Sequence, residues 1–187
     1  MDTDRFPRLV SLACHDLRTP LATIYGFART LTRGEGLDDR TARFLGMIEE
    51  ASEQMTEMLD DVGTAAQIAG GRWEPVLRAV DTLELARSDD ERIEVSGEGA
   101  MIETEAVTVA RGLEALAIAA VRYGPAERVT WRVSGRLLEL SPVTAEAGPV
   151  VVADEVRDLG SLVARLVIEQ LGGSLELRSD ATLRVTL

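Results

Sequence analysis

The chain has 187 residues, enough for one domain of ordinary size or two small ones, and its 45% of apolar residues can form a proper core. Its formal net charge of −12 argues against nucleic-acid binding, because the phosphate backbone would be repelled. With one cysteine, Cys14, and one histidine, His15, the chain can form neither an intramolecular disulfide framework nor a zinc cage of Cys and His ligands.

The residue types that the chain lacks limit the chemistry that it can perform and the compartment in which we expect it. All 20 basic residues are arginine, and the sequence contains no asparagine, so mechanisms that need lysine or asparagine are closed to it. No apolar run reaches the ~18–20 residues that span a bilayer, and no signal-peptide pattern opens the chain. A single cysteine suits a reducing compartment, so we expect a cytoplasmic protein.

The first seventy residues are predicted to form two long helices. In each helix, apolar residues recur at alternating steps of four and three, which is typical of the seam of a coiled coil or helix bundle. In the first helix they are Phe6, Val10, Ala13, Leu17, Pro20, Ile24, Phe27 and Leu31. In the second they are Phe44, Ile48, Ala51, Met55, Met58, Val62 and Ala65. Met47, Met55 and Met58 are interpreted as core-filling residues.

Breakers at residues 33–36 separate the two helices, Asp38 or Asp39 can cap the second, and Gly70 with Gly71 ends it. Helices of this kind would be roughly 45 Å long, and a lone hairpin would leave much apolar surface in water. Two hairpins that pair into a four-helix bundle would cover that surface. We therefore expect a homodimer.

The second half is predicted to mix helices with antiparallel strands. We expect helices over residues 74–87, 105–123 and 159–171, the last closed by Gly172 and Gly173. A short strand is expected over 92–95, a hairpin over 129–133 and 137–140 turned at Ser134 and Gly135, and a final strand pair over 174–177 and 182–187. The predicted fold class is α+β, with a helical hairpin over residues 1–70 and a small α/β sandwich over 72–187, helices on one face of a sheet.

His15 is the residue in the first helix best suited to chemistry. It lies two residues past Ala13, toward the flank of the helix, with Thr19 one turn later on the same face and Asp16 next to it. Imidazole is a nucleophile at neutral pH, and a nearby carboxylate can keep one ring nitrogen protonated while the other attacks phosphorus. Taken alone, such a histidine could equally be an ordinary residue on the flank of a bundle.

The run of residues 11–21, Ser-Leu-Ala-Cys-His-Asp-Leu-Arg-Thr-Pro-Leu, resembles the H-box of the sensor histidine kinases, and the resemblance extends over both heptad helices. It implies that His15 is phosphorylated, that Asp16 is its acid–base partner, and that Thr19 aids dephosphorylation of a response regulator. Arg18 is either catalytic or a solvated charge near the incoming phosphate.

By the same resemblance, receiver domains of response regulators would dock on the hairpin below the histidine. The residues that could set specificity there are Ala22, Thr23, Gly26, Arg29 and Thr30, although each could equally belong to an ordinary solvated helix face. We interpret Glu49, Glu50, Glu53 and Glu57 on the second helix as solvated surface.

The second half resembles the ATP-binding domain of the same family, but only weakly. Residues 116–125 have the outline of the family's N-box helix, where an asparagine holds magnesium, yet the matching residue is Ala119. A phosphate-loop glycine is replaced by Asp158, the adenine-binding motif is at best a remnant at residues 146–149, and about ten residues remain for the ATP lid. We therefore expect a degenerate domain that binds no cofactor.

The leading interpretation is a phosphotransfer protein that relays phosphoryl groups between response-regulator aspartates through His15, with magnesium supplied by the receiver domains. With fourteen residues before His15, we expect no sensor domain. Three alternatives stay open: a histidine kinase with a divergent ATP site, a response-regulator phosphatase, and an adaptor that docks partners without chemistry.

Overall fold

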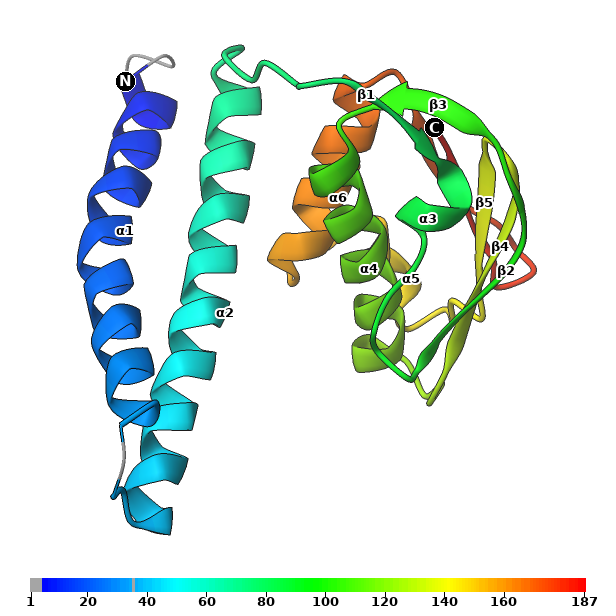
Figure 1. The fold of residues 1–187 in the computed structure, drawn as a ribbon. Coiled ribbons are helices and arrows are strands. Elements are labelled where there is room, and N and C mark those ends of the chain that lie inside the picture. The colour runs from blue at the N-terminus through cyan, green and yellow to red at the C-terminus, as the bar shows by residue number, and fades with distance from the viewer. Residues whose placement is uncertain (1–4, 35) are drawn as a thin grey trace. The chain divides into compact units, whose positions relative to one another are not determined.

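The computed structural model describes residues 5–34 and 36–187. The chain forms two compact units, with the division between Trp73 and Glu74, close to the predicted boundary at residues 70–72. The first unit is a helical hairpin and the second combines a mixed sheet with helices (Figure 1).

The hairpin consists of α1 (Arg5–Thr32) and α2 (Asp39–Ala69), as predicted. Asp38 caps α2, since its carboxylate accepts hydrogen bonds from the amide and the hydroxyl of Thr41 at 2.9 and 2.8 Å. Gly70 is the C-cap, and Gly71 follows with φ of 61°, a left-handed conformation that favours glycine. Local sequence signals therefore define both ends of α2.

The contact between the two helices uses a different stripe from the predicted seam. The buried residues of α1 are spaced seven apart, at Pro7, Cys14, Leu21 and Ala28, and those of α2 are Leu45, Ser52, Gly63 and Ala66. The predicted seam was wrong for this contact: Phe6, Leu17, Ile24, Phe27, Leu31, Met55 and Met58 are each more than half exposed. Most of the residues in this inner stripe are small, apart from Leu21 and Leu45, and many of the larger apolar side chains lie outside the contact. Met47 is also more than half exposed, so the methionines do not fill the core of a single hairpin.

The second unit begins with a small strand pair that the sequence did not reveal. Strand β1 (Arg78–Asp81) pairs antiparallel with β3 (Met101–Thr104), with Val80 opposite Ile102. The helix predicted over residues 74–87 was wrong, because only α3 (Thr82–Leu85) is helical there. Pairing with a strand twenty residues away overrides the local helical pattern of this segment.

The main sheet has the strand order β2-β4-β5-β7-β6, in which β2 and β4 are parallel and the other neighbours antiparallel. Its strands are β2 (Ile93–Gly99), β4 (Val129–Gly135), β5 (Leu137–Ser141), β6 (Ser174–Leu177) and β7 (Leu183–Thr186). The predicted hairpin and final strand pair are confirmed, although the hairpin turns one residue later than expected, at Gly135 and Arg136, with φ of 62° at Gly135. The strand predicted over 92–95 extends to Gly99.

Helices α4 (Ala106–Tyr123), α5 (Gly148–Val151) and α6 (Leu159–Gln170) cover one face of this sheet (Figure 1). Alternate strand residues, among them Trp131, Leu138 and Leu183, are fully buried on that side. The predicted α+β class is confirmed. In the described residues, no helix combines the length and the apolar character needed to cross a membrane.

Candidate phosphoacceptor site

His15 lies on the surface of α1 with its side chain 77% exposed. Its Nδ1 is 3.2 Å from Oδ1 of Asp16, whose side chain is also largely exposed. A carboxylate at this nitrogen favours the tautomer with the proton on Nδ1, so Nε2 keeps the lone pair that a nucleophile needs. The arrangement is that of an accessible imidazole with its proton-bearing nitrogen oriented by a neighbour.

The helix presents His15 to solvent because the preceding residue anchors it. Cys14 is buried in the contact with α2, and successive helical side chains point about 100° apart. Thr19, one turn further along, is exposed like His15. The helix continues through Pro20, whose missing amide leaves the carbonyl of Asp16 without its usual helical donor.

Arg18 contacts the second helix, in an interaction that the sequence analysis missed. Its Nη2 donates to Oδ1 of Asp60 at 2.6 Å, with side chains 45% and 39% exposed. An ideal Cβ at Gly63 would lie 3.6 Å from the same Nη2, so the guanidinium crosses α2 where that helix carries no side chain. The residues lie 42 positions apart, beyond any local sequence signal.

A second polar bridge joins the two helices, seven residues after Arg18 in α1 and seven residues before Asp60 in α2. The hydroxyl of Tyr25 donates to Oε1 of Glu53 at 2.9 Å, and Nη1 of Arg29 donates to the same hydroxyl at 3.3 Å. The Arg29 guanidinium also lies 5.7 Å from the centroid of the Tyr25 ring. Glu53 is exposed, in line with its interpretation as solvated surface, and it is also an interhelical partner of Tyr25. Glu49 departs from that interpretation, because its Oε1 is buried.

The residues proposed for receiver docking share an exposed face of α1. At 100° per residue, Ala22 and Gly26 lie within about 20° of His15, and Arg29 lies within about 40°. The hydroxyls of Thr23 and Thr30 donate to carbonyl oxygens of their own helix, at 3.0 and 2.7 Å. A Cβ at Gly26 would meet no atom within 4 Å. This face is therefore fairly flat, because most of its side chains are small.

The opposite face of α1 borders an apolar groove. Ile24 is nine residues from His15, which places it about 180° around the helix. The groove has a volume of about 480 Å³ and is lined by Leu21, Ile24, Phe44, Met47, Ile48, Ala51, Ser52 and Met55. The hairpin thus carries His15 on one face and a continuous apolar surface on another.

The second unit offers no oxygen ligand at the N-box position. Ala119 is fully buried in α4, and its methyl group cannot coordinate magnesium. Asp158 caps α6 by accepting a hydrogen bond from the amide of Ser161 at 2.9 Å, and its other oxygen lies 3.3 Å from Nη1 of Arg122. A carboxylate of the chain itself therefore occupies the helix end where a phosphate would bind.

Helices α4 and α6 also pack closely against each other. A Cβ at Gly160 would lie 2.7 Å from the Cβ of Ala115, and one at Gly112 would lie 3.1 Å from the Cβ of Ala164, so α4 and α6 are in direct contact. Nη1 of Arg165 holds the short segment between α5 and α6, donating to the carbonyl of Val152 at 2.7 Å and to Asp154 at 2.9 Å. These contacts hold α4, α6 and the segment between α5 and α6 together.

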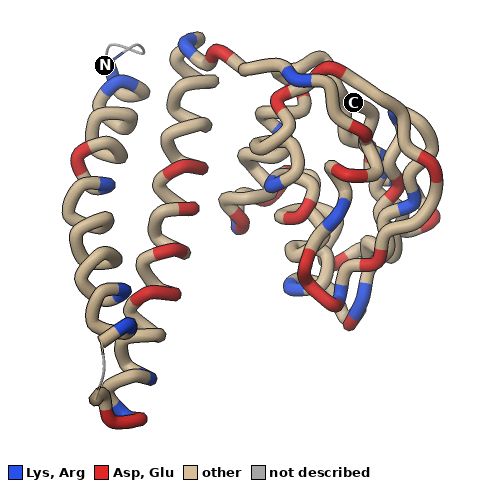
Figure 2. Tube along the Cα trace, viewed as in Figure 1, with Lys and Arg blue, Asp and Glu red and all other residues tan. Residues whose placement is uncertain are grey.

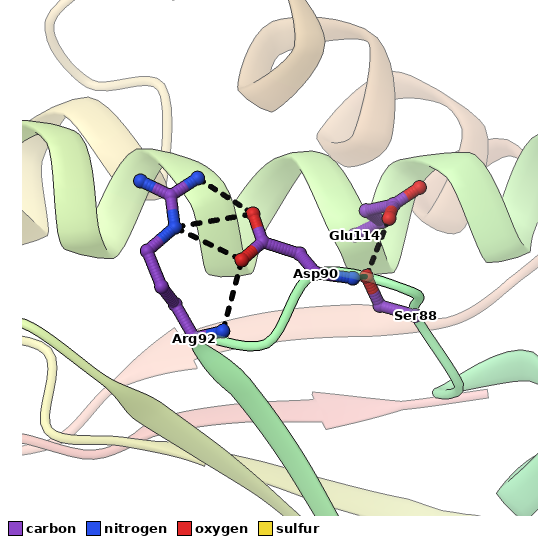
Figure 3. A network of polar contacts seen from close by, with 4 residues as sticks. All are labelled: Ser88, Asp90, Arg92 and Glu114. Atoms are coloured by element: carbon purple, nitrogen blue, oxygen red, sulfur yellow. Dashed lines mark hydrogen bonds and ion pairs between the residues drawn. The ribbon is translucent and has the colours of Figure 1, made fainter.

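A separate polar network ties the start of β2 to α4 (Figure 3). The Ser88 hydroxyl donates to Oε1 of Glu114 at 2.5 Å, and the amide of Asp90 donates to Ser88 at 3.1 Å. Arg92 holds the Asp90 carboxylate through its amide and guanidinium, and this hydrogen bonding lowers the pKa of Asp90 to about 2. The network fixes the loop that leads into β2.

Acidic residues are spread along α2 rather than gathered at one point (Figure 2). Across residues 5–34 and 36–187, no three His, Cys, Asp or Glu side chains cluster in a way that could hold a metal ion.

Comparison with known proteins agrees with these features. Residues 8–71, which span most of the hairpin and include His15, match the His Kinase A (phospho-acceptor) domain family. Sensor protein DivL of Caulobacter vibrioides is 24% identical over 208 residues, an alignment that covers 96% of this chain and 27% of DivL. The chain therefore spans about a quarter of the length of this curated relative.

Two solved structures share the fold. Full-length ShkA in complex with AMPPNP matches with a TM-score of 0.68 at 18% identity, over 96% of this chain and 45% of that one. The histidine kinase AdeS of Acinetobacter baumannii matches with a TM-score of 0.54 at 18% identity, over 92% of this chain and 95% of that one. The domain match on the hairpin, the related sensor protein and the shared fold support a histidine-kinase-like family for this chain.

Proposed function

We propose that this protein is a histidine-containing phosphotransfer protein, which accepts a phosphoryl group on His15 from the aspartyl phosphate of one receiver domain and passes it to another. The observation that carries the proposal is a contrast between its two units. The imidazole of His15 is exposed and contacts Asp16, whereas in the second unit Ala119 stands at the N-box position and Asp158 caps the start of α6.

The proposed transfer needs few groups from this chain. Nε2 of His15 attacks phosphorus, the N–P bond forms, and the acyl O–P bond of the receiver's aspartyl phosphate breaks to leave a carboxylate. The proton on Nδ1 stays on the ring, where Asp16 stabilises the developing positive charge. The reverse sequence delivers the phosphoryl group to a second receiver, and magnesium belongs to the receiver domains.

The two faces of the hairpin suggest how partners bind. A receiver would dock on the fairly flat face that Ala22, Thr23, Gly26, Arg29 and Thr30 form below His15, and Thr19 would orient water when a receiver is dephosphorylated. A second copy of the chain would cover the apolar groove and form the expected four-helix bundle. Each dimer would then carry two phosphoacceptor histidines on its outer surface.

A histidine kinase is the second candidate function, because DivL is a sensor protein, AdeS is a histidine kinase and the matching ShkA structure holds AMPPNP. That alternative requires ATP to bind beside Ala119 and Asp158. A receiver phosphatase, acting through Thr19, and a docking adaptor without chemistry are further alternatives.

A labelling assay with two arms tests the source of the phosphate. One arm offers radiolabelled ATP with magnesium, and the other offers a panel of receiver domains phosphorylated with radiolabelled acetyl phosphate. We expect label on this protein in the second arm alone, and none on a His15→Gln variant. Labelling from ATP would contradict the relay in favour of a kinase. Labelling in neither arm would favour the adaptor, and loss of label from the receiver without its transfer would favour the phosphatase.

A further inference from the structure

The ion pair between Arg18 and Asp60 lies beside the phosphoacceptor histidine and connects the two helices. Arg18 is three residues after His15, so their side chains are neighbours on the surface of α1. Its guanidinium nonetheless contacts Asp60 on α2, at 2.6 Å. A cation next to His15 in the sequence is therefore held by a carboxylate on the other helix.

The pair is well suited to exchange partners. Both side chains are more than a third exposed, and an ion pair with this exposure contributes little to stability, because water and salt screen it. A phosphoryl group carries nearly two negative charges and three acceptor oxygens, and arginine binds such groups through two parallel hydrogen bonds. A phosphate on His15 would thus be a stronger partner for Arg18 than one half-exposed carboxylate.

We propose that Asp60 is a positioning residue, which holds Arg18 while His15 is unmodified and yields it to the phosphoryl group when His15 is phosphorylated. This inference rests on the proposed function of His15. Arg18 then stabilises the phosphorylated state directly, and Asp60 weakens that stabilisation by competing for the guanidinium. Asp60 keeps the N–P bond labile enough for onward transfer, in the same way that a competing ligand lowers an apparent affinity.

The structure supplies a matched control for this role. The bridge between Tyr25 and Glu53 joins the same two helices, two turns nearer the loop that connects them and further from His15. Removing the charge of Glu53 therefore tests what a polar bridge contributes to the hairpin. Removing the charge of Asp60 also weakens a polar bridge between the helices, but in addition it releases Arg18.

The experiment measures the exchange equilibrium of His15 with phosphoramidate, a small phosphoryl donor, at a fixed concentration of ammonia. Phosphorus NMR gives the ratio of phosphorylated to free protein for the wild type and for Asp60→Asn, Arg18→Gln, the double variant and Glu53→Gln. We expect this ratio to rise about two- to fivefold for Asp60→Asn, to fall about three- to tenfold for Arg18→Gln, and to stay within about twofold of wild type for Glu53→Gln.

Two further results separate positioning from a merely structural role. The double variant should match Arg18→Gln, because Asp60 acts through Arg18. The rise caused by Asp60→Asn should also shrink as salt is added, since the competition is electrostatic.

The inference is overturned if Asp60→Asn leaves the ratio unchanged, or if it raises the ratio equally when Arg18→Gln is already present. The inference is also overturned if Asp60→Asn and Glu53→Gln change the ratio equally, because the loss of either interhelical bridge would then explain the change. If the wild type acquires no phosphate on His15 at all, the proposed function itself is contradicted, and that outcome is seen before any variant is compared.

Discussion

The carboxylate of Asp158 accepts a hydrogen bond from the backbone amide of Ser161 at 2.9 Å and so closes the first turn of α6 with a charge of the chain itself. The same carboxylate lies 3.3 Å from Arg122 on α4. A helix N-terminus that would attract a nucleotide phosphate is therefore already neutralised. The second unit shares its fold with the matching solved structures, while Ser161 and Arg122 are the partners of the Asp158 carboxylate.

We predict that Asp158→Ala weakens the fold without creating nucleotide binding. Loss of the cap should lower the free energy of unfolding of the second unit by about 0.5–2 kcal/mol. Titration calorimetry with ATP and magnesium should give no binding heat for the wild type or the variant, because Ala119 and the contact of α4 with α6 remain. Saturable binding to the wild type would contradict the proposal that the site is closed.

Gly160 provides a test of the packing between α4 and α6. A Cβ there would lie 2.7 Å from that of Ala115, so Gly160→Ala must push the helices apart, at a cost of about 1–3 kcal/mol. Urea unfolding followed by Trp131 fluorescence, in a Trp73→Phe background, reports on this unit alone. Gly46→Ala in α2 is the control: its Cβ meets no atom within 4 Å, and the Trp131 transition should not move. An unaltered transition for Gly160→Ala would show that the helices are less tightly packed than described.

The apolar groove of the hairpin predicts a change in oligomeric state on substitution. Sedimentation should show a dimer for the wild type, and Ile24→Glu or Met47→Glu should produce monomers, because each would bury an unpaired charge in the proposed interface. Ala22→Glu, on the His15 face of α1, is the matched control and should remain a dimer. A wild type that sediments as a monomer would contradict the four-helix bundle.

The Asp90–Arg92 pair predicts a loss of stability in acid. The pKa of Asp90 is lowered from its usual 3.8 to about 2, so the charged form is favoured by folding. Its contribution is fully present above about pH 4 and is lost as the pH falls toward 2. Because Arg92 is about half exposed, we expect no more than about 1 kcal/mol.

The measurement for this pair is the difference in unfolding free energy between wild type and Asp90→Asn. The difference should be constant from pH 5 to 7 and vanish near pH 2. Asp89→Asn, one residue away in the same loop, is the control and should show no such dependence. A difference that persists at pH 2 would mean that the Asp90 side chain stabilises the loop by something other than its charge.

Features encoded by neighbouring residues could be predicted from the sequence. The ends of α2 at Asp38 and Gly70, the position of His15 beside Asp16, and the final strand pair all depend on short-range capping, periodicity and turn chemistry. The sequence also showed that the N-box asparagine is missing at Ala119, since the chain contains no asparagine.

Features that depend on distant partners could not be predicted. A heptad pattern offers two adjacent stripes, and the sequence did not show that the small residues, with Cys14 and Gly63, would form the contact within one chain. Strand β1 was predicted as part of a helix because its partner, β3, lies twenty residues away. The pairing of Arg18 with Asp60 required the register of the two helices, which only the folded hairpin provides.

His15 is proposed to carry a phosphoryl group between receiver domains. The most direct test loads this protein from a receiver phosphorylated with radiolabelled acetyl phosphate, removes that receiver, adds a second, unlabelled receiver, and locates the label by electrophoresis and peptide mapping. We predict that label reaches a peptide containing His15 and then leaves it for the aspartate of the second receiver, with neither step in His15→Gln. Label that never reaches His15, or reaches it equally well from ATP, would contradict the claim.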